Sequence, residues 1–422
     1  MTYPESVRLL YSLGNEIKTA KLGLDRIQRL LEELGSPHRV GRFVHVAGTN
    51  GKGSTCAMIE SGLRAAGLRT GLYTSPHLVE PAERIRIGGV PISPEQFAGA
   101  CQTVHQACER LLAAGALECH PTYFETVTAM AFVLFRELRV DVAVLEVGLG
   151  GRLDATNVVA PDLAVITPID FDHEAFLGKS LEAIAAEKAG ILKRGSMALL
   201  APQRPEVDPV LREHAAAAGV TPTLASEWEI RDLELDALGN RFTSIGRARV
   251  RVECPLAGEH QVTNALTAVA ALELLGIPAA AIERGIRAAR WPGRLERVAQ
   301  EPDVFLDGAH NPAGARARAA YVRRFHAGRC VWLVFGAMRD KAAAEMGGIL
   351  APVADRVILT APAQVRAVRP QILLELFDHP RARAVPDLAA ALTLIEEAAP
   401  GDVIFITGSL FLVGEARARL VQ

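Results

Sequence analysis

Short apolar runs alternate with longer amphipathic stretches through the first half of the chain. The apolar runs have five to eight residues and lie at 42–47, 68–73, 140–147 and 163–167. Runs of this length, separated by helical stretches such as 122–138, are typical of strands that alternate with helices. The pattern therefore predicts βαβ units and a mostly parallel sheet.

The hydrophobic pattern changes between about residues 198 and 255. Residues 240–253 alternate apolar and polar side chains around a turn near Gly246, which predicts an antiparallel hairpin with one solvated face. Helices are expected to resume between residues 260 and 290.

The segment Trp291-Pro292-Gly293-Arg294 predicts a domain boundary, because proline and glycine interrupt regular structure. Four further apolar runs follow it, at 304–306, 331–335, 357–359 and 403–407. They predict a second, doubly wound domain. The expected fold class is α/β, with domains at 1–295 (mostly parallel sheet plus a small antiparallel part) and 296–422 (Rossmann-like).

Composition narrows the class of protein. Half of the 422 residues are hydrophobic and 22% are charged, which excludes a disordered chain. The net charge of −2 provides no basic field for nucleic acid or anionic membranes. Neither a signal peptide nor an uncharged apolar stretch of ~18 residues occurs, and the six cysteines form no Cys-x-x-Cys pair. We therefore expect a cytoplasmic monomer with no nucleic-acid or membrane partner.

A glycine-rich turn between the first strand and the next helix carries the main chemical signal. It reads Gly48-Thr-Asn-Gly-Lys-Gly-Ser-Thr55. Glycines let backbone N–H groups close around a phosphate, the lysine neutralises charge, and the helix N-terminus adds its dipole. The turn departs from the standard P-loop, because its first two glycines are three apart and Gly53 separates Lys52 from Ser54. It still predicts nucleotide phosphate binding by Asn50, Gly51, Lys52, Gly53 and Ser54.

Acidic residues follow the next two buried strands. Glu146 closes the run 140–147, and Asp170, Asp172 and His173 follow the run 163–167. Ligands of parallel sheets bind at this carboxyl edge. A carboxylate there either caps a loop or holds Mg²⁺ beside the phosphates, and the upstream P-loop favours Mg²⁺.

Several other polar residues are ambiguous one by one but would face a single cleft between the domains. Lys188 alone reads as a solvated helix lysine, whereas Asn264 shares a helical face with His260. Arg294 lies in the boundary segment, where it could reach a phosphate. Asp307 and His310 follow the first strand of the second domain.

Eleven segments match one known family in order along nearly the whole chain. They are HVAGTNGKGS (45–54), YTSPHL (73–78), ERIRI (83–87), TYFETVTAMAF (122–132), LEVGLGGRLDATN (145–157), ITPIDFDH (166–173), IAAEKAGILK (184–193), LAGEHQVTNA (256–265), WPGRLE (291–296), LDGAHN (306–311) and ITGSLFLVGE (406–415). Together they resemble the folylpolyglutamate synthase/dihydrofolate synthase family of the Mur ligase superfamily.

The resemblance implies ATP- and Mg²⁺-dependent addition of L-glutamate to dihydropteroate, to folates, or to both, through an acyl phosphate. It implies catalytic roles for Lys52, Lys188, His310 and Asp307, with Lys188 carbamylated. Ser75, Glu146 and His173 match Mg²⁺ ligands, and Asn264, Arg294 and Asp307 match nucleotide contacts. Ser409 and His310 match positions that orient glutamate or its amine, and Thr122, Phe124 and Asp154 match the pterin end. One departure is Ala342, where the family usually has a second acidic residue after Lys341.

Two other functions remain open from the sequence. A cell-wall Mur ligase would act on UDP-muramoyl substrates, but the P-loop strand already begins at residue 42, so we expect no separate N-terminal UDP-binding domain. A nucleotide-binding switch or scaffold would bind ATP without amine-dependent turnover. The sequence also leaves open which folate substrate is used.

Overall fold

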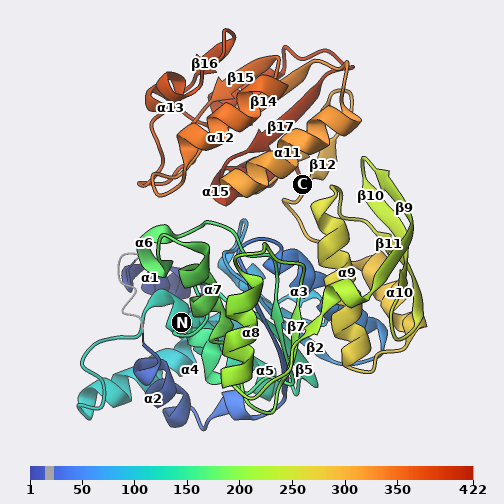
Figure 1. The fold of residues 1–422 in the computed structure, drawn as a ribbon. Coiled ribbons are helices and arrows are strands. Elements are labelled where there is room, and N and C mark those ends of the chain that lie inside the picture. Colours follow the sequence, from blue (N-terminus) through green and yellow to red (C-terminus); the bar gives the residue numbers. More distant parts are fainter. Residues whose placement is uncertain (15–22, 422) are drawn as a thin grey trace.

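The computed structural model describes residues 1–14 and 23–421 and contains three sheets (Figure 1). The largest has eight strands in the spatial order β4-β3-β2-β5-β1-β6-β7-β8. Their bounds are β1 Arg42–Ala47, β2 Thr70–Tyr73, β3 Ile85–Ile87, β4 Val90–Pro91, β5 Val142–Glu146, β6 Leu163–Ile166, β7 Met197–Leu200 and β8 Thr223–Leu224. The strands from β2 to β8 in this order are parallel, whereas β3 pairs antiparallel with β2, and β4 pairs antiparallel with β3 at the edge.

Helices cover both faces of this sheet because its strands bury side chains on both sides. In β5, Val142 and Val144 join the core under α3 (Lys52–Ala65), α9 (His260–Leu274) and α10 (Ala279–Ala288). The alternate residues Ala143 and Leu145 join the core on the other face. The helices over that face are α1 Tyr3–Ser12, α2 Asp25–Glu33, α4 Pro94–Ala113, α5 Tyr123–Glu137, α6 Glu174–Leu177, α7 Leu181–Ala189 and α8 Asp208–Ala217. Near-continuous apolar strands are what a parallel sheet covered on two faces requires.

A small antiparallel sheet packs beside α9 and α10. The predicted hairpin is confirmed as β10 (Gly239–Ile245) and β11 (Arg249–Cys254), which turn at Gly246. A third strand, β9 (Glu229–Asp236), pairs with β10 at the outer edge. The sequence pattern did not predict β9, because most of its side chains are exposed and give no apolar alternation.

The C-terminal sheet has the order β12-β13-β17-β14-β15-β16. Its predicted strands are confirmed as β13 (Asp303–Leu306), β14 (Val331–Phe335), β15 (Arg356–Leu359) and β17 (Val403–Thr407), all parallel. The pattern missed the two edge strands, antiparallel β12 (Glu296–Ala299) and parallel β16 (Ala382–Ala384), which have few buried residues. Its helices are α11 Pro312–Phe325, α12 Ala343–Leu350, α13 Pro370–Leu376, α14 Leu388–Ile395 and α15 Leu410–Leu420.

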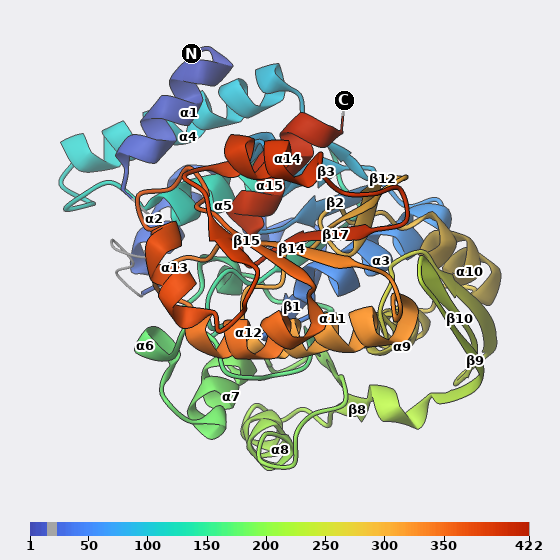
Figure 2. The same ribbon diagram turned by 90° about the horizontal axis from the view of Figure 1, so that it is seen from above.

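The C-terminal sheet and its helices lie over the carboxyl edge of the large sheet (Figures 1 and 2). The chain passes between the two parts in the segment from Ala288, at the end of α10, to Glu296, at the start of β12. The predicted boundary at residue 295 falls in this segment and stays a prediction. Away from it, the tip of the β9–β10 hairpin meets α11, where the Tyr321 hydroxyl donates a hydrogen bond to the Ala237 carbonyl at 2.6 Å.

No helix in residues 1–14 or 23–421 is long and apolar enough to cross a membrane.

Candidate active site

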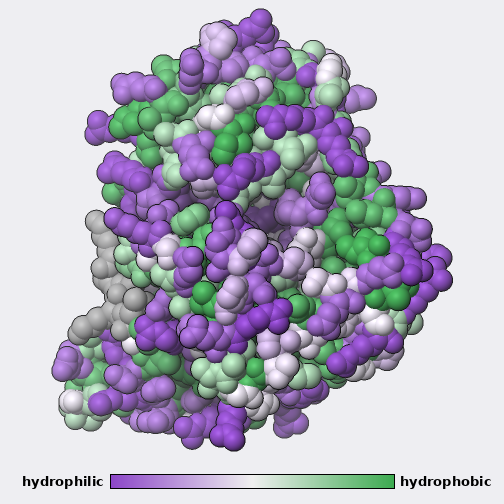
Figure 3. Space-filling view, viewed as in Figure 1, coloured by the Kyte–Doolittle hydropathy of each residue, from purple (hydrophilic) through white to green (hydrophobic). Residues whose placement is uncertain are grey.

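A cavity of about 660 Å³ lies between the two parts of the molecule and is lined by both. Figure 3 shows the corresponding recess, with hydrophilic residues gathered around it. The volume is typical of a small-molecule site. Every residue predicted for the site lines it: Asn50, Gly51, Lys52, Gly53, Ser54, Ser75, Thr122, Phe124, Glu146, Asp154, His173, Lys188, Asn264, Arg294, Asp307, His310 and Ser409.

The glycine-rich turn joins β1 directly to α3. Gly51 occupies the N-cap position of α3 with a φ of +86°, so the helix begins without a side-chain cap. Uncapped N–H groups at a helix start are free to bind an anion, and the helix dipole favours negative charge there. The turn is thus suited to a phosphate group.

A buried chain of hydrogen bonds links this turn to α9. The side-chain amide of Gln261 donates to the Ser54 hydroxyl at 3.2 Å. The side-chain amide of Asn264 donates to the side-chain oxygen of Gln261 at 2.9 Å. Asn264 also lies so close to Gly51 that a Cβ on Gly51 would collide with Asn264 Oδ1. The phosphate turn and the predicted nucleotide contact on α9 therefore form one packed unit.

This packing predicts the effect of Gly51→Ala. Alanine would adopt an unfavourable positive φ and push Asn264 aside, so we expect a stability loss of about 1–3 kcal/mol and weaker ADP binding. Thermal melting and calorimetric titration with ADP measure the two effects. Gly67→Ala is the matched control, since Gly67 has a φ of +90° but nothing within 4 Å of an added Cβ. Equal ADP affinity in both variants would show that the collision with Asn264 is unimportant.

Two lysines converge on the backbone of the turn. Lys52 Nζ donates to the carbonyls of Gly48 and Thr49, both at 3.1 Å, and Lys188 Nζ donates to the Gly48 carbonyl at 2.8 Å. Burial, together with the charge of Lys52, lowers the pKa of Lys188 to about 7. The sequence-based reading of Lys188 as a solvated helix lysine is therefore wrong, because the side chain of Lys188 is buried beside the turn.

The predicted magnesium ligands come from three strand ends. Glu146 ends β5, Ser75 follows β2, and His173 follows β6. The Ser75 N–H donates to Glu146 Oε2 at 3.2 Å. Burial raises the pKa of Glu146, although the nearby Lys52 charge opposes this. Burial lowers the pKa of His173 to about 4, which leaves a neutral imidazole with a lone pair for a metal.

These residues fit a magnesium site that is completed by a substrate. In the described parts of the chain, no three His, Cys, Asp or Glu side chains lie close enough to hold a metal alone. Mg²⁺ commonly takes only one or two protein oxygens and completes its shell with phosphate and water. One carboxylate and one hydroxyl beside a phosphate turn meet that requirement.

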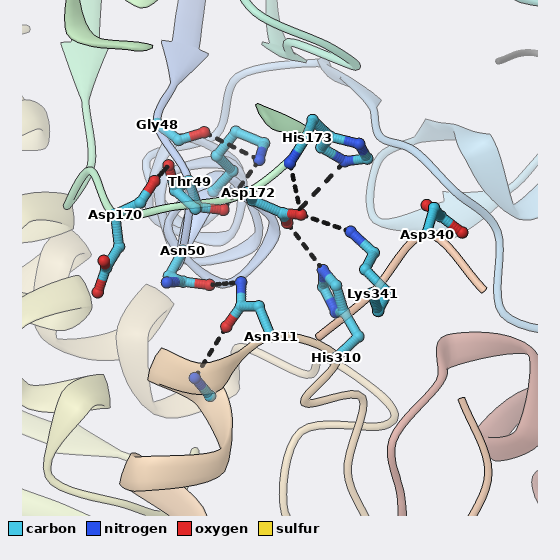
Figure 4. Close-up of polar contacts among 12 residues, drawn as sticks. Gly48, Thr49, Asn50, Asp170, Asp172, His173, His310, Asn311, Asp340 and Lys341 are labelled. Atoms are coloured by element: carbon cyan, nitrogen blue, oxygen red, sulfur yellow. Dashed lines mark hydrogen bonds and ion pairs between the residues drawn. The ribbon is translucent and has the colours of Figure 1, made fainter. Parts of the chain in front are cut away.

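Asp172 joins the two parts of the molecule inside the cavity (Figure 4). Its carboxylate lies 2.6 Å from Lys341 Nζ and 3.5 Å from His310 Nε2, both from the C-terminal part. Burial alone would raise the pKa of Asp172, but the hydrogen bond and charge of His310, with the charge of Lys341, hold it far below its ordinary value. A second bridge runs from the Asn311 amide to Asn50 Oδ1 at 2.9 Å.

Arg294 and Asp307 lie where the chain passes between the two parts. Arg294 is half-buried, and its Nη1 donates to the Gly293 carbonyl at 3.0 Å. The Asp307 carboxylate accepts hydrogen bonds from the N–H groups of Leu295 and Ala309, both at 3.0 Å. Both predicted nucleotide contacts are therefore at the cavity wall.

Three of the four predicted substrate residues use their polar side-chain atoms locally in this conformation, and the fourth, Phe124, has none. Thr122 caps α5 through the Glu125 N–H, and Ser409 caps α15 through the Phe411 N–H. Asp154 accepts from the N–H groups of Gly148 and Leu149 and so shapes its own loop. Phe124 packs against Gly148. Their roles toward a substrate stay predictions.

Sequence reasoning missed several residues that build the site. Gln261 could have been found from its position three residues before Asn264 on the same helical face. Asn311 lay in a quoted motif, but nothing in the sequence pairs it with Asn50. No local sequence pattern marks Lys341 or Arg318, which is buried against Asp307, as part of the site.

Known proteins agree with this architecture. The family described as "Mur ligase middle domain" matches residues 46–272, and "Mur ligase, glutamate ligase domain" matches residues 293–410. A Mycobacterium tuberculosis protein named dihydrofolate synthase/folylpolyglutamate synthase is 37% identical over 436 aligned residues, covering 93% of this chain and 89% of the relative.

The fold comparison gives the same family. A crystal structure of Mycobacterium tuberculosis folylpolyglutamate synthase complexed with ADP and AMPPCP superposes with a TM-score of 0.93 at 36% identity, covering 100% of this chain and 98% of the other. A Halobacterium salinarum relative, named a probable bifunctional folylpolyglutamate synthase/dihydropteroate synthase, is 39% identical; the match covers 99% of this chain and 52% of the longer relative. The chain therefore belongs to the folylpolyglutamate synthase/dihydrofolate synthase family of Mur ligases, which are ATP-dependent ligases.

Proposed function

We propose that this chain joins L-glutamate to the carboxylate of dihydropteroate, of a folate, or of both, through an acyl phosphate, with release of ADP and phosphate. One observation carries the proposal: the phosphate turn and the His310 loop face each other across one cavity. Asn50–Asn311 and Asp172–Lys341 link the two sides. A ligase that brings a nucleotide and an amine to one carboxylate needs this arrangement.

The charges in the cavity suit phosphoryl transfer to a carboxylate. A carboxylate is a poor electrophile, and phosphorylation supplies a leaving group. The two reactants are both anionic, so fixed positive charge is the main requirement. Lys52 and Arg294 provide it from the turn and the linker. When bound at Glu146 and Ser75, Mg²⁺ would add further neutralisation of the phosphates.

The position of the C-terminal part over the carboxyl edge also suits the proposal. An acyl phosphate hydrolyses readily, so the site must exclude water while the amine attacks. The side chains of Asp172 and Lys341 are each 10% exposed, and their ion pair joins the two parts. Contacts of this kind hold the two parts together around the reactants.

The environment of Lys188 predicts carbamylation. Only a neutral amine attacks CO₂, forming a carbamate and releasing a proton. With a pKa of about 7, Lys188 is largely neutral above pH 7 and largely protonated below it. We therefore expect activity to fall when CO₂ is removed, to return with bicarbonate, and to lose this response as pH falls below 7.

Labelling with ¹³CO₂ and carbon NMR tests this directly. Lys188→Met should remove the carbamate signal. Lys193→Met should keep it, because the Lys193 ammonium, whose pKa is about 8, is held by the carbonyls of Asn157 and Val159, both at 2.6 Å. A signal that survives in the Lys188 variant would assign the carbamate elsewhere.

Phosphate release from ATP and Mg²⁺ with L-glutamate tests the proposed function. Dihydropteroate and tetrahydrofolate are supplied in separate reactions. Turnover with both would establish a bifunctional enzyme, and turnover with one would name its substrate. A folded, ADP-binding protein that releases no phosphate with either substrate would overturn the folate assignment. UDP-muramoyl substrates would then be tested.

A further inference from the structure

Arg318 on α11 is a buried cation that the reaction described above does not use. It is 3% exposed and lies at the cavity wall. Its Nη2 lies 2.5 Å from Asp307 Oδ2. Its guanidinium carbon lies 5.5 Å from the ring centroid of Tyr321 and 5.4 Å from that of Phe405. Arg318 is thus fixed by one ion pair and two aromatic faces.

The other guanidinium nitrogens make Arg318 unsuited to direct substrate binding. Arg318 Nε and Nη1 are shielded from solvent and have no hydrogen-bond partner among the described residues. A bound molecule could not reach them without rearrangement of the wall. Burying a guanidinium is costly unless a charge compensates for it. Asp307 provides that charge, so the two side chains form a structural unit.

Asp307 connects two segments that carry predicted site residues. One oxygen accepts the N–H of Leu295, which follows Arg294, and the other accepts the N–H of Ala309, which precedes His310. Leu295 has a φ of +48°, which is unfavourable for leucine and needs such support. The carboxylate therefore fixes the linker relative to the 307–311 loop.

The charges around Asp307 keep it ionised. Burial alone would raise the pKa of Asp307, but the charge and hydrogen bond of Arg318, followed by the charges of Arg294 and His260, hold it below its ordinary value. Among the contributions that lower the pKa, the charge of Arg318 is the largest. An ionised carboxylate accepts both backbone N–H groups, whereas a protonated one loses part of this capacity.

We propose that Arg318 is a positioning residue for nucleotide binding: it holds Asp307 so that the linker and the 307–311 loop present Arg294 and His310 to the cavity. The proposal rests on the nucleotide site within the proposed function but not on the identity of the acceptor. It assigns to α11, which is remote from the phosphate turn in sequence, a part in setting nucleotide affinity.

Calorimetric titration with ADP and Mg²⁺ between pH 5.5 and 8.5 tests the proposal. We expect Arg318→Met to weaken ADP binding about tenfold, as loss of a supporting partner commonly does. The loss should deepen toward low pH, where Asp307 without its guanidinium partner takes up a proton. Arg318→Lys keeps the charge, so it should stay closer to the wild-type affinity and show a flatter pH dependence.

Arg329→Met is the matched control. Arg329 pairs with Asp303 at 2.6 Å in the same part of the molecule but does not line the cavity. Its loss should lower the Tm without changing the Kd of ADP. If Arg318→Met is insoluble, Arg318→Gln, which keeps a donor without the charge, takes its place. Wild-type ADP affinity at every pH in a folded, uncharged Arg318 variant would overturn the proposal.

The failure of the proposed function would look different. Wild-type protein that binds ADP but shows no glutamate-dependent phosphate release would overturn the folate ligase assignment alone. The pH-dependent affinity difference between Arg318→Met and Arg329→Met would still decide the role of Arg318.

Discussion

Replacing Lys52 with alanine is expected to lower ATP turnover by about 10²–10³-fold, because the site loses a fixed positive charge where anionic reactants meet. The structure places Lys52 at the first turn of α3 and at the cavity wall. Its ammonium is bound only to the carbonyls of Gly48 and Thr49 among the described contacts. Loss of these two hydrogen bonds should lower the free energy of unfolding only on the order of 1 kcal/mol.

Phosphate release and thermal melting measure the two effects on Lys52→Ala. Lys179→Ala is the control, since Lys179 is an exposed lysine that does not line the cavity. It should match the wild type in both assays. Glutamate-dependent turnover that persists in Lys52→Ala would contradict the assignment of the glycine-rich turn to phosphate binding.

Glu146→Gln is expected to raise the Mg²⁺ concentration for half-maximal activity about tenfold or more, because a neutral amide binds the cation weakly. Glutamine keeps the shape of the side chain and its acceptor for the Ser75 N–H. Burial raises the pKa of Glu146, so the ionised form opposes folding. We therefore expect the Tm of Glu146→Gln to be no lower than that of the wild type.

Activity measured across a Mg²⁺ titration gives the result. Glu60→Gln is the matched control: Glu60 is also buried, at 3% exposed, but pairs with Thr70 and Arg64 away from the cavity. It should lower the Tm and leave the Mg²⁺ midpoint unchanged. An unchanged midpoint in Glu146→Gln would remove Glu146 from the metal site.

The parts of the site that were predictable from sequence are local. The apolar run 42–47, the glycines after it and the polar start of the next helix are contiguous, so their roles follow from backbone geometry and hydrophobic period. The same holds for Glu146, which ends an apolar run. Strand ends of a parallel sheet meet at one edge, which brought Glu146 and His173 to the same cavity without further information.

The contacts between the two parts were not predictable from one sequence. Asp172 and Lys341 are 169 positions apart, and Asn50 and Asn311 are 261 apart. Neither member of these pairs has a local pattern that specifies its partner. Arg318 reads as one more basic residue on an amphipathic helix, and only tertiary packing turns it inward against Asp307.

The hydrogen bond from Tyr321 to Ala237 has a mechanical consequence. It joins the two parts outside the cavity, away from the covalent linker at 289–295 and from the Asp172–Lys341 and Asn50–Asn311 contacts inside it. Opening the cavity by rotation about the line through the linker and Tyr321 would break the contacts inside the cavity and keep this hydrogen bond. Sliding of one part across the other would break it as well.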